Sequence, residues 1–173
     1  IIENRLAIAN TKPIDNDSNL STEIINEFQL NNDEQRLAIE GFCGQLLYCV
    51  SGGPGTGKTT ITAACLAKIT RLTASDKRPI AIAAPTGRAA GRLIESLTDS
   101  FNSRQIAMPE VEAKTIHRLL KYSNRQKRFH HNSLNKLDAK LVILDEASML
   151  SPYLLASVLE SCSADCSVLL LGD

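Results

Sequence analysis

Short continuous apolar runs alternate along the chain with stretches in which apolar residues recur every three or four positions. The runs are typical of buried parallel strands, because such strands are covered on both faces. They occupy residues 46–50, 80–84, 141–144 and 168–171. Helical spacing is found in residues 21–29, 32–41, 58–72, 88–100, 114–121 and 152–160. The alternation predicts an α/β fold with a mainly parallel sheet and helices on both of its faces.

The segments outside this alternation are polar. Residues 122–138 carry no periodic apolar pattern, and we expect an irregular excursion there. A polar run at 15–19 indicates a linker, so we divide the chain into an N-terminal segment and linker, 1–29, and one domain, 30–173. Within that domain Asn32 is predicted to cap the helix that follows it.

The composition narrows the class of protein without naming a partner. Hydrophobic residues make up 43% of the chain and charged residues 22%, as in an ordinary globular protein. The chain has 19 basic and 19 acidic residues, so its net charge gives no sign of nucleic-acid binding. We expect neither membrane spanning nor secretion, because there is no long apolar run and no basic-then-apolar leader. Five cysteines without a CxxC pair predict reduced, mostly structural thiols in a cytoplasmic protein.

A glycine-rich loop joins the strand at 46–50 to the helix at 58–72. It matches the phosphate-binding pattern G-x-x-x-x-G-K-[ST] with Gly52, Gly53, Pro54, Gly55, Thr56, Gly57, Lys58 and Thr59. Glycines let successive backbone N–H groups converge on phosphate oxygens, and the helix N-terminus adds the positive end of its dipole. Lys58 is predicted to reach the β- and γ-phosphates of ATP, and the Thr59 hydroxyl to ligate Mg²⁺.

Two carboxylates directly follow the strand at 141–144. Ligands bind outside the carboxyl ends of strands in open α/β sheets, so Asp145 is placed to anchor Mg²⁺ together with Thr59. Glu146 is placed to orient or deprotonate the attacking water. Combined with Lys58, these residues predict a P-loop enzyme that hydrolyses ATP.

Four further segments follow the phosphate loop in order: 84–90 (APTGRAA), 114–120 (KTIHRLL), 144–149 (LDEASM) and 170–173 (LLGD). Together with the loop, and with RFHHN at 128–132, they resemble superfamily 1 DNA helicases of the RecD type over residues 30–173. The resemblance implies a RecA-like domain with three α/β/α layers. It also implies that this is the first motor domain, 1A, truncated at the C-terminus and lacking the second motor domain.

The resemblance to this family implies that the protein is an ATP-driven 5′-to-3′ DNA helicase. It would work on single-stranded DNA in double-strand-break repair and recombination. Its partners would be the beta and gamma subunits of exodeoxyribonuclease V, in the bacterial cytoplasm. Without the arginines of a second motor domain, we expect this chain to bind Mg·ATP and DNA weakly, to hydrolyse ATP very slowly and to unwind nothing. A free-standing RecD-like helicase is an open alternative.

The resemblance also implies roles for individual residues. Gln35 is similar to a glutamine that reads adenine, although a residue at that position can instead close a capping box with Asn32. A segment that grips the single-strand backbone corresponds to Pro85, Thr86 and Arg88. A second DNA-contacting segment corresponds to Thr115 and His117. For His117 the alternative is a surface histidine that packs locally.

The neutral net charge hides a segregated distribution. Residues 114–137 carry seven basic side chains and no acidic one, whereas residues 1–40 and 138–173 are acidic. We expect this basic stretch to follow DNA phosphates through Arg125, Lys127 and Arg128, with Tyr122 and Phe129 available to stack on bases. A solvated charged face is the alternative interpretation.

Two other classes of protein fit the phosphate loop. A small-molecule phosphotransferase would need an acceptor pocket and a lid, and no segment resembles either. An interaction subunit with a vestigial ATP site would not need Lys58, Thr59, Asp145 and Glu146, each of which is the residue type that the chemistry requires.

Overall fold

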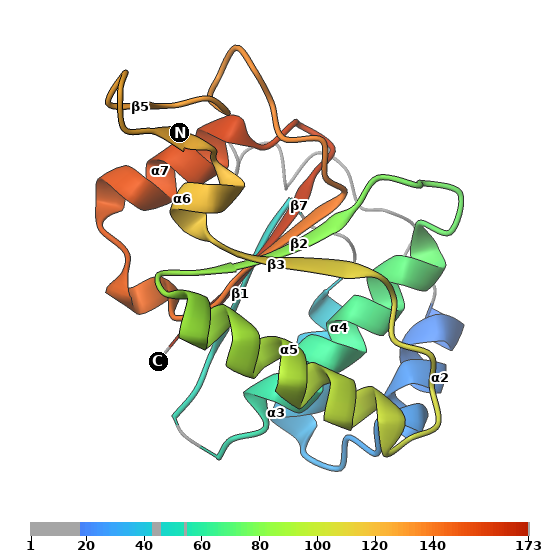
Figure 1. Ribbon diagram of the computed structural model, residues 1–173. Helices are drawn as coiled ribbons and strands as arrows, with labels where there is room; N and C mark the ends of the chain where they lie inside the picture. Colours follow the sequence, from blue (N-terminus) through green and yellow to red (C-terminus); the bar gives the residue numbers. More distant parts are fainter. Residues whose placement is uncertain (1–17, 43–45, 54, 173) are drawn as a thin grey trace.

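A computed structural model describes residues 18–42, 46–53 and 55–172 of the chain. Its centre is a five-stranded sheet in which every pairing is parallel (Figure 1). The strands lie in the order β1 (Leu47–Ser51), β7 (Ser167–Gly172), β6 (Leu141–Leu144), β2 (Ile80–Ala84) and β3 (Val111–Thr115). The predicted parallel sheet is confirmed.

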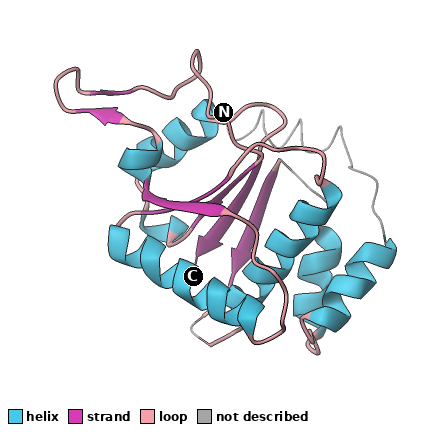
Figure 2. Ribbon diagram, turned by 45° about the vertical axis from the view of Figure 1, so that its right-hand side comes forward, coloured by secondary structure: helices cyan, strands magenta, loops and turns pink. Residues whose placement is uncertain are grey.

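Helices cover both faces of the sheet, which confirms the predicted three layers (Figures 1 and 2). One face carries α2 (Ser18–Glu27), α3 (Asp33–Gly41), α4 (Lys58–Leu72) and α5 (Gly87–Asn102). The other carries α6 (Ile116–Leu119) and α7 (Pro152–Ser161). A short 3₁₀ helix, η1 (Ala147–Met149), lies between β6 and α7.

Side chains of the central strands alternate between the two cores, since successive residues of a strand point to opposite faces. In β6, Leu141 and Ile143 join the core beneath α4 and α5, while Val142 and Leu144 join the core beneath α6 and α7. All four are completely buried. This double coverage is why the strand has a continuous apolar sequence rather than an alternating one.

Helix α4 is buried on more than one side. Residues Ile61 to Ile69 are all buried, because α2, α3 and α5 pack around the helix in addition to the sheet. The helical spacing of apolar residues predicts a stripe through Ile61, Cys65, Ile69 and Leu72, of which the first three are buried and Leu72 is half-buried. The stripe therefore underestimates the burial of this helix, which includes the completely buried Lys68.

The predicted helix at 114–121 is wrong in its first part. Lys114 and Thr115 are the last residues of β3, and the helix α6 is only Ile116–Leu119. Strand β3 was not predicted, because its residues, VEAKT, are half-exposed or exposed and form no apolar run. Among the described strands it pairs only with β2, so an edge position explains this polar composition.

The polar stretch 122–138 contains a small antiparallel hairpin instead of being wholly irregular. Its strands are β4 (Tyr122–Ser123) and β5 (Arg128–Phe129). The backbone N–H of His130 donates to Leu120 O at 3.1 Å, which ties the end of the hairpin to α6.

The remaining elements agree with the predicted ones to within a few residues. Asn32 caps α3 by accepting a hydrogen bond from Glu34 N at 2.8 Å, as predicted. Helix α2 begins at Ser18, and its Ile24 and Ile25 belong to the same core as α4 and α5. No helix within the described ranges is long and apolar enough to cross a membrane.

Candidate functional site

The phosphate loop lies at the carboxyl edge of the sheet, between β1 and α4. Gly55 and Gly57 have φ angles of 79° and 86°, which lie in the left-handed region that favours glycine. A Cβ atom on Gly57 would also lie 2.5 Å from Gln35 Nε2. The backbone therefore requires glycine at position 57, and a Cβ atom there would also displace the end of the Gln35 side chain. Pro54, predicted as part of the loop, lies outside the described residues.

The first turn of α4 presents backbone N–H groups and the predicted phosphate-binding side chains. Its N-cap residue is Gly57, so no side chain caps the helix. The first N–H groups of a helix have no partner within it, which makes this end suited to an anion. Lys58 Nζ donates to the carbonyl oxygens of Gly52 and Gly53, and Thr59 is half-buried in the same turn.

Asp145 and Glu146 lie at the same edge of the sheet, because β6 is separated from β1 only by β7. Asp145 N donates to Ala83 O at 2.9 Å, and Asp145 Oδ1 accepts from Glu146 N at 2.9 Å. Glu146 has a φ of 53°, so the chain turns sharply there into η1. Both carboxylates are half-buried.

The turn that follows the carboxylates is packed against the end of β7. A Cβ atom on Gly172 would lie 3.4 Å from the backbone nitrogen of Ser148 in η1. The carbonyl oxygen of Gly172 accepts a hydrogen bond from Gly52 N at 3.3 Å. The end of β7 thus contacts both the phosphate loop and the turn that carries the carboxylates. The motifs of the sequence place these segments in one family, but their contact is visible only in the structure.

Gln35 contacts the phosphate loop. Its Nε2 donates to Thr56 O at 3.1 Å, whereas Asn32 accepts from Glu34 N. The alternative in which Gln35 closes a capping box is therefore wrong for this structure. A cavity of about 240 Å³ opens beside these groups. Gln35, Ala38, Gly52, Thr56, Lys58 and Ile61 are among the residues that line it.

The two segments with expected DNA contacts begin at the carboxyl ends of neighbouring strands. Ala84 pairs with Thr115 in the register of β2 and β3, which places Pro85–Arg88 beside Thr115–His117. Thr86 Oγ1 accepts from Ala89 N at 3.1 Å, and Thr115 Oγ1 accepts from Arg118 N at 3.3 Å. Both threonines are helix N-caps, a role that sequence reasoning missed and that their position just before a helix could have indicated.

His117 packs against the hairpin. Its ring centroid lies 5.6 Å from that of Tyr122 and 5.8 Å from that of Phe129, and the latter two are 5.2 Å apart. The contact required by the local-packing alternative for His117 is therefore present. His117 is nevertheless exposed. The predicted DNA-contacting residues Arg88, Arg125, Lys127 and Arg128 are exposed as well.

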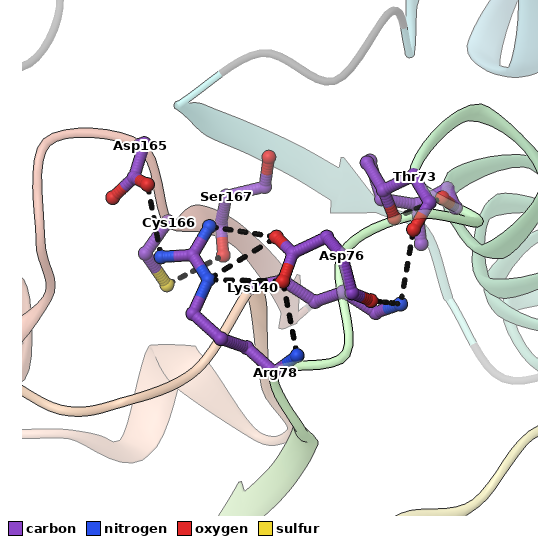
Figure 3. A network of polar contacts seen from close by, with 8 residues as sticks. Thr73, Asp76, Arg78, Lys140, Asp165, Cys166 and Ser167 are labelled. Carbon is purple, nitrogen blue, oxygen red and sulfur yellow. Dashed lines mark hydrogen bonds and ion pairs between the residues drawn. The ribbon is translucent and has the colours of Figure 1, made fainter.

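A second polar cluster lies at the opposite, amino edge of the sheet (Figure 3). The Arg78 guanidinium contacts Asp76 Oδ2 at 2.7 Å and Asp165 Oδ2 at 2.9 Å. Lys140 Nζ donates to Asp76 O at 2.9 Å. Hydrogen bonds from Arg78 lower the pKa of the Asp76 carboxyl to about 2. None of these residues was predicted from the sequence, because Arg78, Lys140 and Asp165 come from distant parts of the chain and only Asp76 lies close to Arg78 in sequence.

Thiols and metal-ligating groups form no site in the described part of the chain. No group of three or more His, Cys, Asp and Glu residues in it could hold a metal ion. Cys65, Cys162 and Cys166 are buried, and burial raises the pKa of the Cys65 thiol to about 12. Cys49 is exposed although it lies in an apolar run, and Cys43 lies outside the described residues.

One known family matches the part of the chain that contains the phosphate loop and the two carboxylates. Residues 35–173 match the family described as an AAA domain. The chain belongs to this family. An AAA domain implies nucleotide binding, which agrees with the position of the loop, Gln35 and the carboxylates around one edge.

Curated relatives carry the RecD name. The chain is 36% identical over 149 residues to the RecBCD enzyme subunit RecD of Mycolicibacterium smegmatis, covering 82% of this chain and 27% of that protein. It is 37% identical over 153 residues to the same subunit of Mycobacterium tuberculosis, covering 84% and 26%. The ATP-dependent RecD2 DNA helicase of Deinococcus radiodurans is 35% identical over 142 residues, covering 82% and 17%. The predicted resemblance to RecD-type proteins is confirmed, and the chain spans about a quarter or less of these relatives' length.

A solved structure supports the fold. The UvsW helicase from bacteriophage T4 superposes with a TM-score of 0.58 at 11% sequence identity, covering 82% of this chain and 51% of that one. At this identity the likeness concerns the fold alone. With the parallel sheet and its two helical layers, it agrees with the RecA-like P-loop α/β fold expected from the sequence.

Proposed function

We propose that this chain is the nucleotide-binding part of the first motor domain of a RecD-type, ATP-dependent DNA helicase. The proposal is supported by one observation above all: three groups of residues lie at the carboxyl edge of the same sheet. These are the phosphate loop, Gln35 bonded to it through Thr56 O, and the carboxylates Asp145 and Glu146. The names of its relatives, RecD subunits and a RecD2 DNA helicase, support the same function.

In this proposal ATP lies between Gln35 and the first turn of α4. Lys58 exchanges its contacts with the loop carbonyls for phosphate oxygens, and Glu146 holds the attacking water. The Thr59 hydroxyl and the Asp145 carboxylate offer oxygen ligands of the kind that Mg²⁺ prefers, so they would hold this ion. When bound, Mg²⁺ neutralises charge on the β- and γ-phosphates.

Single-stranded DNA is the proposed second ligand. The adjacent segments with Pro85, Thr86 and Arg88 and with Thr115 and His117 would contact its backbone beside β2 and β3. Because the two threonine hydroxyls cap helices, the exposed Arg88 side chain is the stronger candidate for a phosphate contact. The hairpin would add Arg125, Lys127 and Arg128, which are exposed and lie in the stretch without acidic residues.

The assembly and location of the whole protein are also proposals. Relatives named as RecBCD subunits favour a complex with the beta and gamma subunits of exodeoxyribonuclease V in the bacterial cytoplasm. The relative named as the RecD2 helicase keeps the free-standing alternative open. We retain residues 30–173 as one motor domain, 1A.

The test is ATP hydrolysis by the full-length protein with single-stranded DNA, with a small phosphate acceptor, or with neither. We expect DNA alone to stimulate hydrolysis. Stimulation by the small acceptor would instead support a phosphotransferase, and no hydrolysis at all would support a vestigial site.

Binding of single-stranded DNA by the full-length protein, measured over a range of salt concentrations, tests the hairpin. The triple variant R125Q/K127Q/R128Q should bind DNA with a salt slope lower by up to about 2, since each contact to a single strand contributes roughly 0.7. An unchanged slope would show that the hairpin does not contact DNA.

A further inference from the structure

Lys68 is a completely buried lysine in α4, the most buried of the helices that the structure describes. Its neighbours Leu66, Ala67 and Ile69 are apolar and buried. Burying an amino group is costly unless it is hydrogen-bonded, so the partner of such a group indicates what the lysine does. Lys68 Nζ donates to Ile39 O at 2.6 Å. The proposed mechanism does not use this residue.

Ile39 O, one partner of Lys68, lies in the last turn of α3. The last four carbonyl groups of a helix lack partners within it, and lysine side chains can satisfy them. Ile39 is one of these positions in α3, and the next carbonyl toward the N-terminus, Ala38 O, accepts from the Tyr48 hydroxyl at 2.9 Å. Side chains from α4 and from β1 thus hold the same end of α3.

The opposite end of α3 carries Gln35, one turn before Ile39. A short helix is a rigid unit, so the position of its last turn determines where Gln35 meets the phosphate loop. Gln35 Nε2 there donates to Thr56 O at 3.1 Å. Helix α4 begins with Lys58 and also carries Lys68, so one helix holds both the phosphate-binding lysine and the support of α3.

We propose that Lys68 is a positioning residue for the base of the nucleotide, acting through α3 and Gln35. This inference rests on the proposed function, in which Gln35 reads adenine. A glutamine amide can pair with the amino group and the ring nitrogen at one edge of adenine, whereas guanine presents an acceptor oxygen in place of that amino group. The phosphate loop holds the phosphates, so the position of Gln35 relative to the loop sets whether its amide reaches this edge of the base. That position therefore controls how well the site distinguishes ATP from GTP.

The experiment compares ATP and GTP hydrolysis by the full-length protein and its K68M variant at saturating single-stranded DNA. We expect the ratio of kcat/KM for ATP to that for GTP to fall roughly tenfold, a change of about 1.4 kcal/mol in discrimination. KM for ATP should rise, and kcat at saturating ATP should stay within about twofold, because the phosphate loop is unchanged. An unchanged ratio would overturn the proposal.

K140M is the matched control. Lys140 also donates from Nζ to a backbone carbonyl, Asp76 O at 2.9 Å, but at the amino edge of the sheet. Its loss should lower thermal stability without changing the ratio between ATP and GTP. A fall in the ratio as large as that of K68M would mean that general destabilisation causes the effect, and it would overturn the positioning role.

The variant Q35A separates this inference from the proposed function. If Q35A lowers the ratio and K68M lowers it no further in the Q35A background, the two residues act through one path. If Q35A leaves the ratio unchanged, the adenine role of Gln35 and the role of Lys68 both fail. If Q35A lowers the ratio and K68M does not, only the role of Lys68 fails.

A milder variant covers the case in which K68M does not fold. Y48F keeps the ring that packs on Phe42, at 5.5 Å between centroids, and removes only the hydroxyl that donates to Ala38 O. We expect the ratio to fall about two- to threefold, because one hydrogen bond at the end of α3 is lost. An unchanged ratio in folded Y48F would show that this helix end does not control base selection.

Discussion

The two ends of α4 differ in whether side chains of the protein form hydrogen bonds with the backbone groups there. At the first end the cap residue is Gly57, no side chain caps the helix, and the backbone takes a left-handed turn. At the other end Thr73 N and Thr73 Oγ1 both donate to Ile69 O, at 2.9 and 2.6 Å. Lys140 Nζ donates to Asp76 O just beyond, and Arg78 is held between two carboxylates (Figure 3).

The difference shows how one helix serves both a ligand and the fold. Groups that are satisfied by their own chain stabilise the folded state but have little left to offer a ligand. The N–H groups at the uncapped start of a helix are hydrogen-bonded to water, and a bound phosphate can replace that water. In the proposed function the carboxyl edge binds the nucleotide, whereas polar groups at the amino edge are paired within the chain.

The largest expected effect is on ATP hydrolysis, when a lysine at each end of α4 is replaced by methionine. K58M should lower ATP hydrolysis by the full-length protein at least about 100-fold, because a charge that meets the phosphates is lost. K140M should leave hydrolysis within about twofold and lower the melting temperature. Steady-state hydrolysis and thermal unfolding, measured on both proteins, check this. Equal losses of hydrolysis would mean that the two ends do not differ in function.

An intermediate effect is expected from alanine at Gly57. The left-handed backbone, with φ of 86°, opposes a Cβ atom there, and the Gln35 amide would have to move aside. G57A should lower the free energy of unfolding by about 1–2 kcal/mol. The control G91A, inside α5 where a Cβ meets no atom within 4 Å, should instead raise it by about 0.5–1 kcal/mol. Urea unfolding measures both, and the same sign for both variants would contradict the argument.

The smallest expected effect is a change in pH dependence at the amino edge. The pKa of Asp76 is about 2 in the folded protein and about 3.9 in an unfolded chain. Its contribution to stability is therefore fully present above about pH 4 and is lost as the pH falls toward 2. D76N should lower the free energy of unfolding at pH 7 by up to about 1 kcal/mol and flatten its fall between pH 4 and 2.

Urea unfolding at pH 7, 4, 3 and 2 measures this effect. D138N, at an exposed aspartate, is the control and should keep the wild-type slope. A steep fall that persists in D76N would assign the acid sensitivity to other carboxylates. Loss of ATP hydrolysis in D76N at pH 7 would break the division between the two edges.

The sequence was most informative where the signal is local. The strand at Leu141–Leu144 and the helix at Lys58–Leu72 were predicted at their observed limits, because continuous apolar runs and helical spacing directly reflect burial. The phosphate loop was equally predictable. Its glycines are needed for the conformation of the loop itself, whatever the rest of the chain does.

Edge and capping positions were less predictable. The strand Val111–Thr115 has one sheet neighbour among the described strands and a polar sequence, so it lacks the apolar run that marks the central strands. Thr86 and Thr115 cap helices, although the family motifs suggested DNA contacts for them. A hydroxyl group can serve either purpose, and only the local backbone geometry shows where it is engaged.

The sequence by itself determined the layered α/β fold and predicted the chemistry proposed for the carboxyl edge, since both depend on short segments with a strong physical signature. The tertiary structure decided how distant polar groups pair. Lys68 meets a carbonyl 29 residues away, Arg78 meets Asp165, and Gln35 meets the loop rather than its own helix cap. The environment of a charged or amide group depends on which partner folding brings to it, and no local pattern in the chain records that partner.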